Sequence, residues 1–165
     1  MRPDYIHVAV TTTSDEFAVV TFVMTEYTVD GSVRWTREPT DENIVKLIFR
    51  AGLRPKSWRI IESYDIPADR EYRGAWKDDG DKIYHDINVA KKIHMERLRS
   101  DRAKIMEKLD VEWMKAMSMS DTKTIDEINR KKQILRDFPD QIDSDMKNVK
   151  NIEQLKLINP LKEYK

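Results

Sequence analysis

The sequence contains no cysteine, which excludes disulfides, thiol catalysis and thiolate metal ligands. Its four glycines are scattered, and none belongs to a phosphate-binding or dinucleotide-binding pattern. No apolar run approaches the roughly 18 residues that a membrane-spanning helix needs, and the first residues lack the apolar stretch of a secretion signal. These absences predict a protein that folds in a reducing cytoplasm and does not enter a membrane.

Charge is abundant but unevenly distributed. Charged residues make up 36% of the chain and hydrophobic residues 39%, so a single large core is not expected. Residues 1–87 hold 12 basic and 16 acidic side chains, whereas residues 88–138 hold 13 basic and 9 acidic ones. Opposite charges favour docking of the two regions, within one chain or between copies. Alternatively, the two regions are solvated surfaces whose charges are screened by salt.

The first 66 residues combine short β-type runs with one helical stripe. Ile6, Val8 and Val10 fall on one side of the first run, as the period of two in a strand requires. Thr40 is a good helix N-cap, and Gly52 stands where a glycine ends a helix. The order ββ(β)αβ predicts a small sheet covered on one face by one helix. The predicted elements are strands at 5–12, 17–27 and 33–35, a helix at 41–51 and a strand at 57–64.

The remainder of the chain is mainly helical in its periodicity. An irregular connector follows Pro67, and two amphipathic helices then fold into a long antiparallel hairpin that Pro139 ends. The second helix starts in the range Ser120–Thr124, where Thr124 has the spacing of a capping box, and Asn151 caps one last short helix. The fold class is therefore α+β. The predicted division is a head at 1–66, a connector at 67–87, a hairpin at 88–139 and a tail with a short helix at 140–165.

No constellation of catalytic or metal-binding residues stands out. The histidines His7, His85 and His94 never fall at the spacing that pairs metal ligands on a helix, and His94 lies among charged residues that predict solvent exposure. The acidic turn at 78–81 lacks the later glutamate of a calcium loop. We therefore expect no enzymatic activity, no cofactor and no metal ion.

The basic stretch Lys91–Lys104 is the charge feature most typical of a binding surface. A helix of 3.6 residues per turn splits it, however, with Arg99 and Arg102 on one side and Arg97 on roughly the opposite side. Interleaved acidic residues are plausible ion-pair partners, and no aromatic residue stands among the bases to stack on nucleobases. A solvated face, a surface for a protein partner and a nucleic-acid contact all remain open.

The hairpin has too little interior to bury all of its apolar side chains. Flexible methionines near its open side suit a surface that adapts to a partner. In the connector, Trp76 either plugs the fold or belongs to a docking surface, because tyrosine, tryptophan and arginine dominate binding hot spots. The candidate partner-binding residues are Tyr72, Arg73, Trp76, Arg97, Arg99, Arg102, Met106 and Met114.

Five short segments between residues 65 and 160 form a set, namely Asp69–Gly80, Ala90–His94, Arg97–Arg99, Leu109–Glu112 and Lys132–Pro139. Together they resemble a module found in small proteins of tailed bacteriophages, among tail assembly chaperones and tail-fibre-associated proteins. The resemblance implies a structural or assembly protein without a catalytic site, located in the virion tail region or in the host cytoplasm during assembly. It implies a virion, tail or tail-fibre protein as partner, or further copies of the chain within a particle. The alternative is a nucleic-acid-associated accessory protein that uses Lys91–Lys104.

Overall fold

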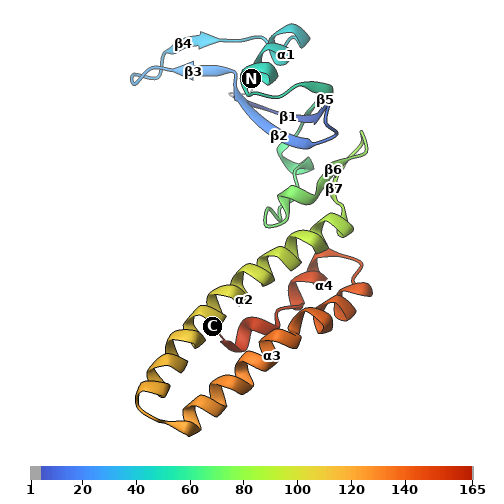
Figure 1. The fold of residues 1–165 in the computed structure, drawn as a ribbon. Helices are drawn as coiled ribbons and strands as arrows, with labels where there is room; N and C mark the ends of the chain where they lie inside the picture. The colour runs from blue at the N-terminus through green and yellow to red at the C-terminus, as the bar shows by residue number, and fades with distance from the viewer. Residues whose placement is uncertain (1–4, 165) are drawn as a thin grey trace. The chain divides into compact units, whose positions relative to one another are not determined.

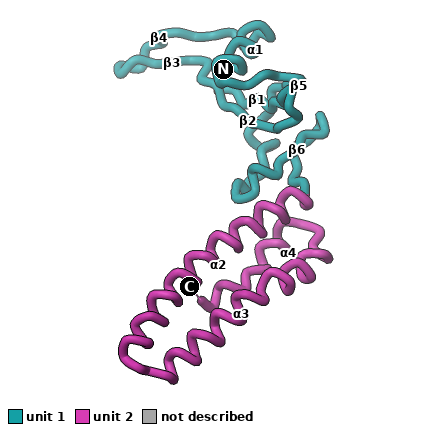
Figure 2. The backbone as a smooth tube through the Cα atoms, in the orientation of Figure 1, with its two compact units in different colours: residues 1–86 teal, residues 87–165 magenta. Residues whose placement is uncertain are grey.

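A computed structural model describes residues 5–164 and divides the chain into two compact units. The N-terminal unit spans residues 1–86 and the C-terminal unit residues 87–165 (Figure 2). The first contains all the strands and the second the long helices, so the α+β class and the helical hairpin are confirmed. Each unit is described by itself below.

The N-terminal unit is built on a three-stranded antiparallel sheet of order β2-β1-β5 (Figure 1). The central strand β1 (Tyr5–Thr12) pairs with β2 (Phe17–Val23) and with β5 (Pro55–Ile61). The predicted alternation is confirmed, because Ile6, Val8 and Val10 are all buried in one cluster. Helix α1 (Asp41–Arg50) covers this face with Ile44 and Ile48.

Local sequence sets the ends of α1 as expected. The Thr40 hydroxyl accepts a hydrogen bond from the Asn43 amide at 3.3 Å, and Gly52 has a φ of 80°, in the left-handed region that favours glycine. The predicted long strand at 17–27 is interrupted at Met24, which is buried in the same core. Beyond it, β3 (Thr25–Tyr27) and β4 (Val33–Thr36) form a separate two-stranded hairpin.

The expectation of an irregular connector at 67–87 was wrong. After two short 3-10 turns, η1 (Ser63–Asp65) and η2 (Arg73–Ala75), strands β6 (Trp76–Asp78) and β7 (Ile83–His85) pair as a hairpin. Trp76 and Ile83 pack with Ala9 and Ile61 in a second core cluster, on the sheet face opposite α1. The sheet is therefore covered on both faces, and the N-terminal unit extends to residue 86.

A bidentate ion pair fastens this second layer to the sheet. The Arg59 guanidinium on β5 donates to both carboxylate oxygens of Asp78 on β6, at 2.9 and 3.0 Å. The Asp78 side chain is only 11% exposed, and the paired carboxylate raises the pKa of Arg59. A charge-assisted bidentate bond of this kind fixes the orientation of β6 as well as its position.

The C-terminal unit is an antiparallel hairpin of α2 (Ile87–Ser118) and α3 (Thr122–Lys147), which run side by side (Figure 1). The turn between them includes Ser120 at a φ of 56°. Asp121 caps α3 by accepting a hydrogen bond from the Thr124 amide at 3.1 Å, so Thr124 belongs to the first turn. The buried seam comprises Leu98, Ile105, Leu109 and Ala116 of α2, and Ile128, Leu135, Phe138 and Ile142 of α3.

Pro139 does not end the hairpin, and the prediction of a polar loop from residue 140 was wrong. Phe138, Ile142 and Met146 are buried at four-residue spacing, so apolar packing continues through the proline and offsets its missing amide hydrogen bond. The predicted short helix is confirmed as α4 (Ile152–Leu157), with Asn151 as its N-cap. It is followed by the 3-10 turn η3 (Pro160–Tyr164), and both elements contact α2.

Candidate docking surfaces on the helical hairpin

The three predicted arginines of α2 have different environments. Arg102 is half-buried and donates to the Leu135 carbonyl across the hairpin at 3.5 Å, so it joins α2 to α3. Arg97 and Arg99 are exposed, and only Arg99 borders a groove. Within the same stretch, Lys104 pairs with Asp101 at 3.7 Å. The basic stretch is therefore divided between residues that make contacts within the hairpin and residues whose side chains are exposed.

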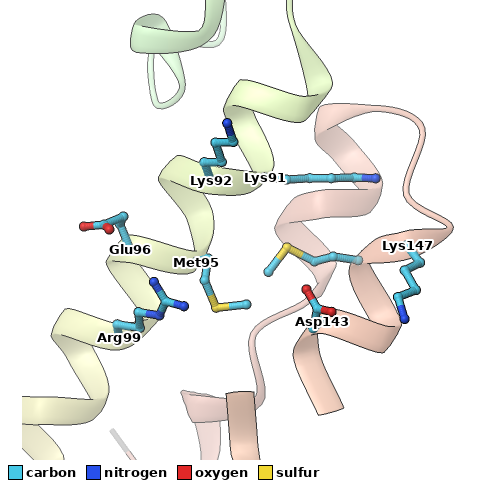
Figure 3. Close-up of a pocket in the computed structure, with 8 residues that line it drawn as sticks. Lys91, Lys92, Met95, Glu96, Arg99, Asp143 and Lys147 are labelled. Atoms are coloured by element: carbon cyan, nitrogen blue, oxygen red, sulfur yellow. The ribbon is translucent and has the colours of Figure 1, made fainter. Parts of the chain in front are cut away.

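The groove lies between the first turns of α2 and the last turns of α3 (Figure 3), with a volume of about 480 Å³. We call it the basic groove, because cations outnumber carboxylates around it. Met95 of α2 points into it in Figure 3, and Asp143 of α3 stands on the other side. Its lining comprises the cations Lys91, Lys92, Arg99 and Lys147, the carboxylates Glu96 and Asp143, and the methionines Met95 and Met146.

The other end of the hairpin exposes apolar side chains. Met114 is 58% exposed, Met117 49% and Met119 78%, and we call these three residues the methionine surface. Val111, close to them in sequence, is 46% exposed. The predicted residue Met106 is half-buried. Of the two methionines among the candidate partner-binding residues, the structure therefore leaves Met114 the more open to a partner.

A buried lysine supports this end of the hairpin, and the sequence did not suggest it. Lys132 of α3 is 8% exposed, and its ammonium lies 2.6 Å from a carboxylate oxygen of Asp110 and 5.5 Å from the centre of the Trp113 ring. This places a cation over an aromatic face. The Trp113 Nε1 atom is buried without a hydrogen-bond partner among the described residues. Such a group is rare in folded proteins.

The aromatic residues predicted as docking anchors lie inside the protein. Tyr72 is fully buried and Trp76 is 9% exposed, and the Trp76 indole donates to His85 Nε2 at 3.0 Å. Of that group only Arg73 is exposed. The burial of Tyr72 and Trp76 corrects their assignment to a docking surface and supports the alternative in which Trp76 plugs the fold.

Comparison with known proteins gives no relative. No family model, no curated protein and no solved structure matches the chain. Function is therefore inferred from the geometry and chemistry of these residues.

The histidines also differ from expectation. His94 is 7% exposed instead of solvated, because the segment after α4 covers it and the Ile158 carbonyl accepts a hydrogen bond from His94 Nε2 at 2.7 Å. His7 joins two hydroxyl groups: its Nδ1 lies 2.8 Å from Thr21 Oγ1 and its Nε2 3.1 Å from Ser63 Oγ. A serine beside a histidine is the arrangement of nucleophilic catalysis, and only the structure brings these two together.

No cluster of metal-ligating side chains occurs within residues 5–164. In the acidic turn, Asp79 accepts hydrogen bonds from the Asp81 and Lys82 amides at 3.0 and 2.8 Å, and these bonds lower the pKa of Asp79. Its oxygen therefore stabilises a plain turn, as predicted. None of the described helices has the length and apolar character of a membrane span.

Proposed function

We propose that the chain is a non-enzymatic docking module of the tail or tail-fibre region of a bacteriophage, and that its helical hairpin binds a larger virion or assembly protein. One observation carries the proposal: the hairpin buries a seam of apolar residues yet leaves the methionine surface open. Methionine side chains are unbranched and polarisable, so they adapt to the shape of a partner. The phage context comes from the resemblance of the five segments.

The methionine surface is suited to a protein partner because it is apolar and lies beyond the seam. Grouped exposed apolar residues are more typical of an interaction site than of a surface in contact with water alone. Trp113, next to Met114 in the chain, adds a large ring whose centre lies 5.5 Å from the Lys132 ammonium.

The basic stretch supports a protein partner more than a nucleic acid. Arg102 is engaged inside the hairpin and Lys104 in an ion pair, so the cations do not form one continuous stripe along α2. Phosphate contacts are strongest at low salt. We expect no binding of duplex DNA at low ionic strength, measured by fluorescence anisotropy, and tight binding there would favour the nucleic-acid alternative.

The proposal assigns the Ser63–His7–Thr21 chain a structural role, in which it joins β1 to β2 and to η1. A serine nucleophile is normally activated by a histidine that a carboxylate orients and stabilises when protonated. Thr21 places a neutral hydroxyl at that position. A fluorophosphonate probe is therefore expected to leave Ser63 unlabelled, as judged by mass spectrometry, and labelling would indicate a hydrolase instead.

The direct experiment is co-purification with the tail and tail-fibre proteins of the same phage. The wild-type chain is expected to form a stable complex with one of them. A variant with Met114→Gln, Met117→Gln and Met119→Gln should lose it, because polar amides replace the apolar contact. Ile60→Gln provides a control at an apolar position of the N-terminal unit that is 45% exposed. Equal complex formation by all three proteins would contradict the proposal.

A further inference from the structure

The two sides of the hairpin are not equally covered. On one side α4 and η3 contact α2, with Leu155 and Leu161 fully buried and the His94–Ile158 hydrogen bond tying the segment to α2. At about 100° per residue, Met95 and Arg99 lie roughly 100° and 140° around α2 from His94. The basic groove therefore occupies the other side, where the described residues of the C-terminal unit leave an open channel.

The charge around the basic groove is unbalanced. Lys92, Arg99 and Lys147 are exposed and Lys91 is half-buried, against the two carboxylates of Glu96 and Asp143. No ion pair within residues 5–164 joins any of these cations to a carboxylate. An acidic ligand would therefore bind these cations without first breaking an ion pair within the described part of the chain.

The shape and lining favour a peptide over a small molecule. Small-molecule sites fix their ligands with a few precisely held polar groups. Here the polar groups are the ends of long cationic side chains and the carboxylates of Glu96 and Asp143, and no ion pair within residues 5–164 holds them in place. Half-buried Met95 supplies an adaptable apolar contact from α2, and Met146, only 5% exposed, lines the groove from α3. A channel between two antiparallel helices is also where a third helix packs in a bundle.

We infer that the basic groove binds an acidic amphipathic helix of a partner protein as a third helix of the bundle. Apolar residues of that helix, spaced i, i+3 and i+4, would contact Met95 and Met146. Its carboxylates would face Lys92, Arg99 and Lys147. The inference rests on the proposed function as a docking module. It adds the basic groove as a second binding surface and specifies an acidic amphipathic helix as its ligand.

The test uses the full chain and a synthetic helical peptide with leucine at i, i+3, i+4 and i+7 and glutamate elsewhere. Saturable binding is expected by fluorescence anisotropy, weakening as salt is raised. In spectra of ¹³C-methyl methionine, the signals of Met95 and Met146 should shift, while that of Met24, buried in the N-terminal unit, should not. This mapping uses the wild-type chain, so it does not depend on the folding of any variant.

Charge reversal provides the matched comparison. Arg99→Glu with Lys147→Glu should weaken peptide binding by about tenfold or more, because attraction becomes repulsion at two positions. Lys131→Glu with Arg136→Glu, at two exposed cations of α3 outside the basic groove, should change it by less than about twofold. Equal weakening by both variants would overturn the inference, because it would show that the peptide responds to the net charge of the chain and not to the basic groove.

Other outcomes also overturn it. Equal binding of a peptide with lysine in place of glutamate would remove the electrostatic basis, and tighter binding of duplex DNA would make the groove a nucleic-acid contact. Absence of peptide binding, with a tail-protein complex that still depends on Met114, would reject the groove and keep the proposed function. Loss of both would reject the docking module itself.

Discussion

The two units of this chain use their apolar residues differently. In the N-terminal unit a three-stranded sheet is covered on one face by α1 and on the other by the β6–β7 hairpin, each with its own buried cluster. In the C-terminal unit two long helices bury one seam, and α4 with η3 covers one side of it. The remaining surface carries an open groove and exposed methionines.

Polar side chains connect distant residues in both units. In the N-terminal unit, Arg59–Asp78 and His7–Ser63 connect residues that are distant in sequence, so side chains hold the layers together. In the C-terminal unit, Lys132–Asp110 and His94–Ile158 do the same, whereas Arg99 and Lys147 have no ion-pair partner within residues 5–164. Large apolar side chains are exposed in both units, for example Val23 and Phe49 in the first and Met114 in the second. The proposed docking role rests on the methionines and the groove of the helical hairpin.

The largest expected effect follows from removing the Trp76 side chain, which packs on the sheet face opposite α1. Trp76→Ala should reduce the free energy of unfolding of the N-terminal unit by roughly 3–5 kcal/mol, because it empties the centre of the second core cluster. Hydrogen exchange of the β1 amides measures the free energy of unfolding of this unit. Tyr64→Ala, at a residue that is 84% exposed, is the control. A loss below about 1 kcal/mol for Trp76→Ala would show that the second layer is dispensable.

The hairpin seam offers a comparison between adjacent residues. Leu135 is fully buried and Ile134 is 53% exposed. Leu135→Ala should cost about 2–5 kcal/mol and Ile134→Ala less than about 1 kcal/mol, as judged by urea unfolding followed by far-ultraviolet circular dichroism. Similar costs at both positions would mean that the hairpin has no single buried seam.

Many of the helices and strands could be predicted from the sequence, wherever a local pattern is enough to define the element. The alternation of Ile6, Val8 and Val10, the Thr40 cap and the helical periodicity of α2 each predicted an element that the structure contains. These features depend on neighbours in the chain. The fold class could therefore be predicted before any tertiary contact was known.

The missed features depend on contacts between distant residues. Strands β6 and β7 have three residues each, too few for a recognisable period, and packing against Ala9 and Ile61 holds them. Pro139 normally ends a helix, yet buried Ile142 and Met146 continue α3 beyond it. His94 is buried only because a segment 64 residues later covers it. The basic groove likewise depends on how α2 and α3 align.

A smaller effect is expected at the ion pair between the sheet and its second layer. Asp78→Asn removes the charge that Arg59 binds while keeping the side-chain volume, and should cost the N-terminal unit about 1–3 kcal/mol. Asp81→Asn, at an exposed residue of the same turn, should change stability by less than about 0.5 kcal/mol. Chemical denaturation of both variants measures the difference, and equal values would assign no stabilising role to the pair.

The smallest expected effect concerns the turn between β3 and β4. Hydrogen bonds from the Thr28 and Ser32 hydroxyls and the Ser32 amide lower the pKa of Asp30 to about 2 from 3.8. Because the folded-state pKa is depressed, the stabilisation is complete above pH 3.8 and is lost as pH falls through about 2. The Ser32 amide resonance should titrate with that midpoint. A midpoint near 3.8 would show that these bonds do not form in solution.

The central claim is the proposal that a protein partner binds the methionine surface of the hairpin. Methionine oxidation with hydrogen peroxide tests it most directly. In the free chain Met114, Met117 and Met119 should oxidise readily, because all three side chains are exposed, whereas Met24 at 2% exposure should resist. In the complex with a tail or tail-fibre protein the first three should become protected and Met24 should stay unchanged. Equal oxidation of the three methionines in the free chain and in an intact complex would contradict the claim.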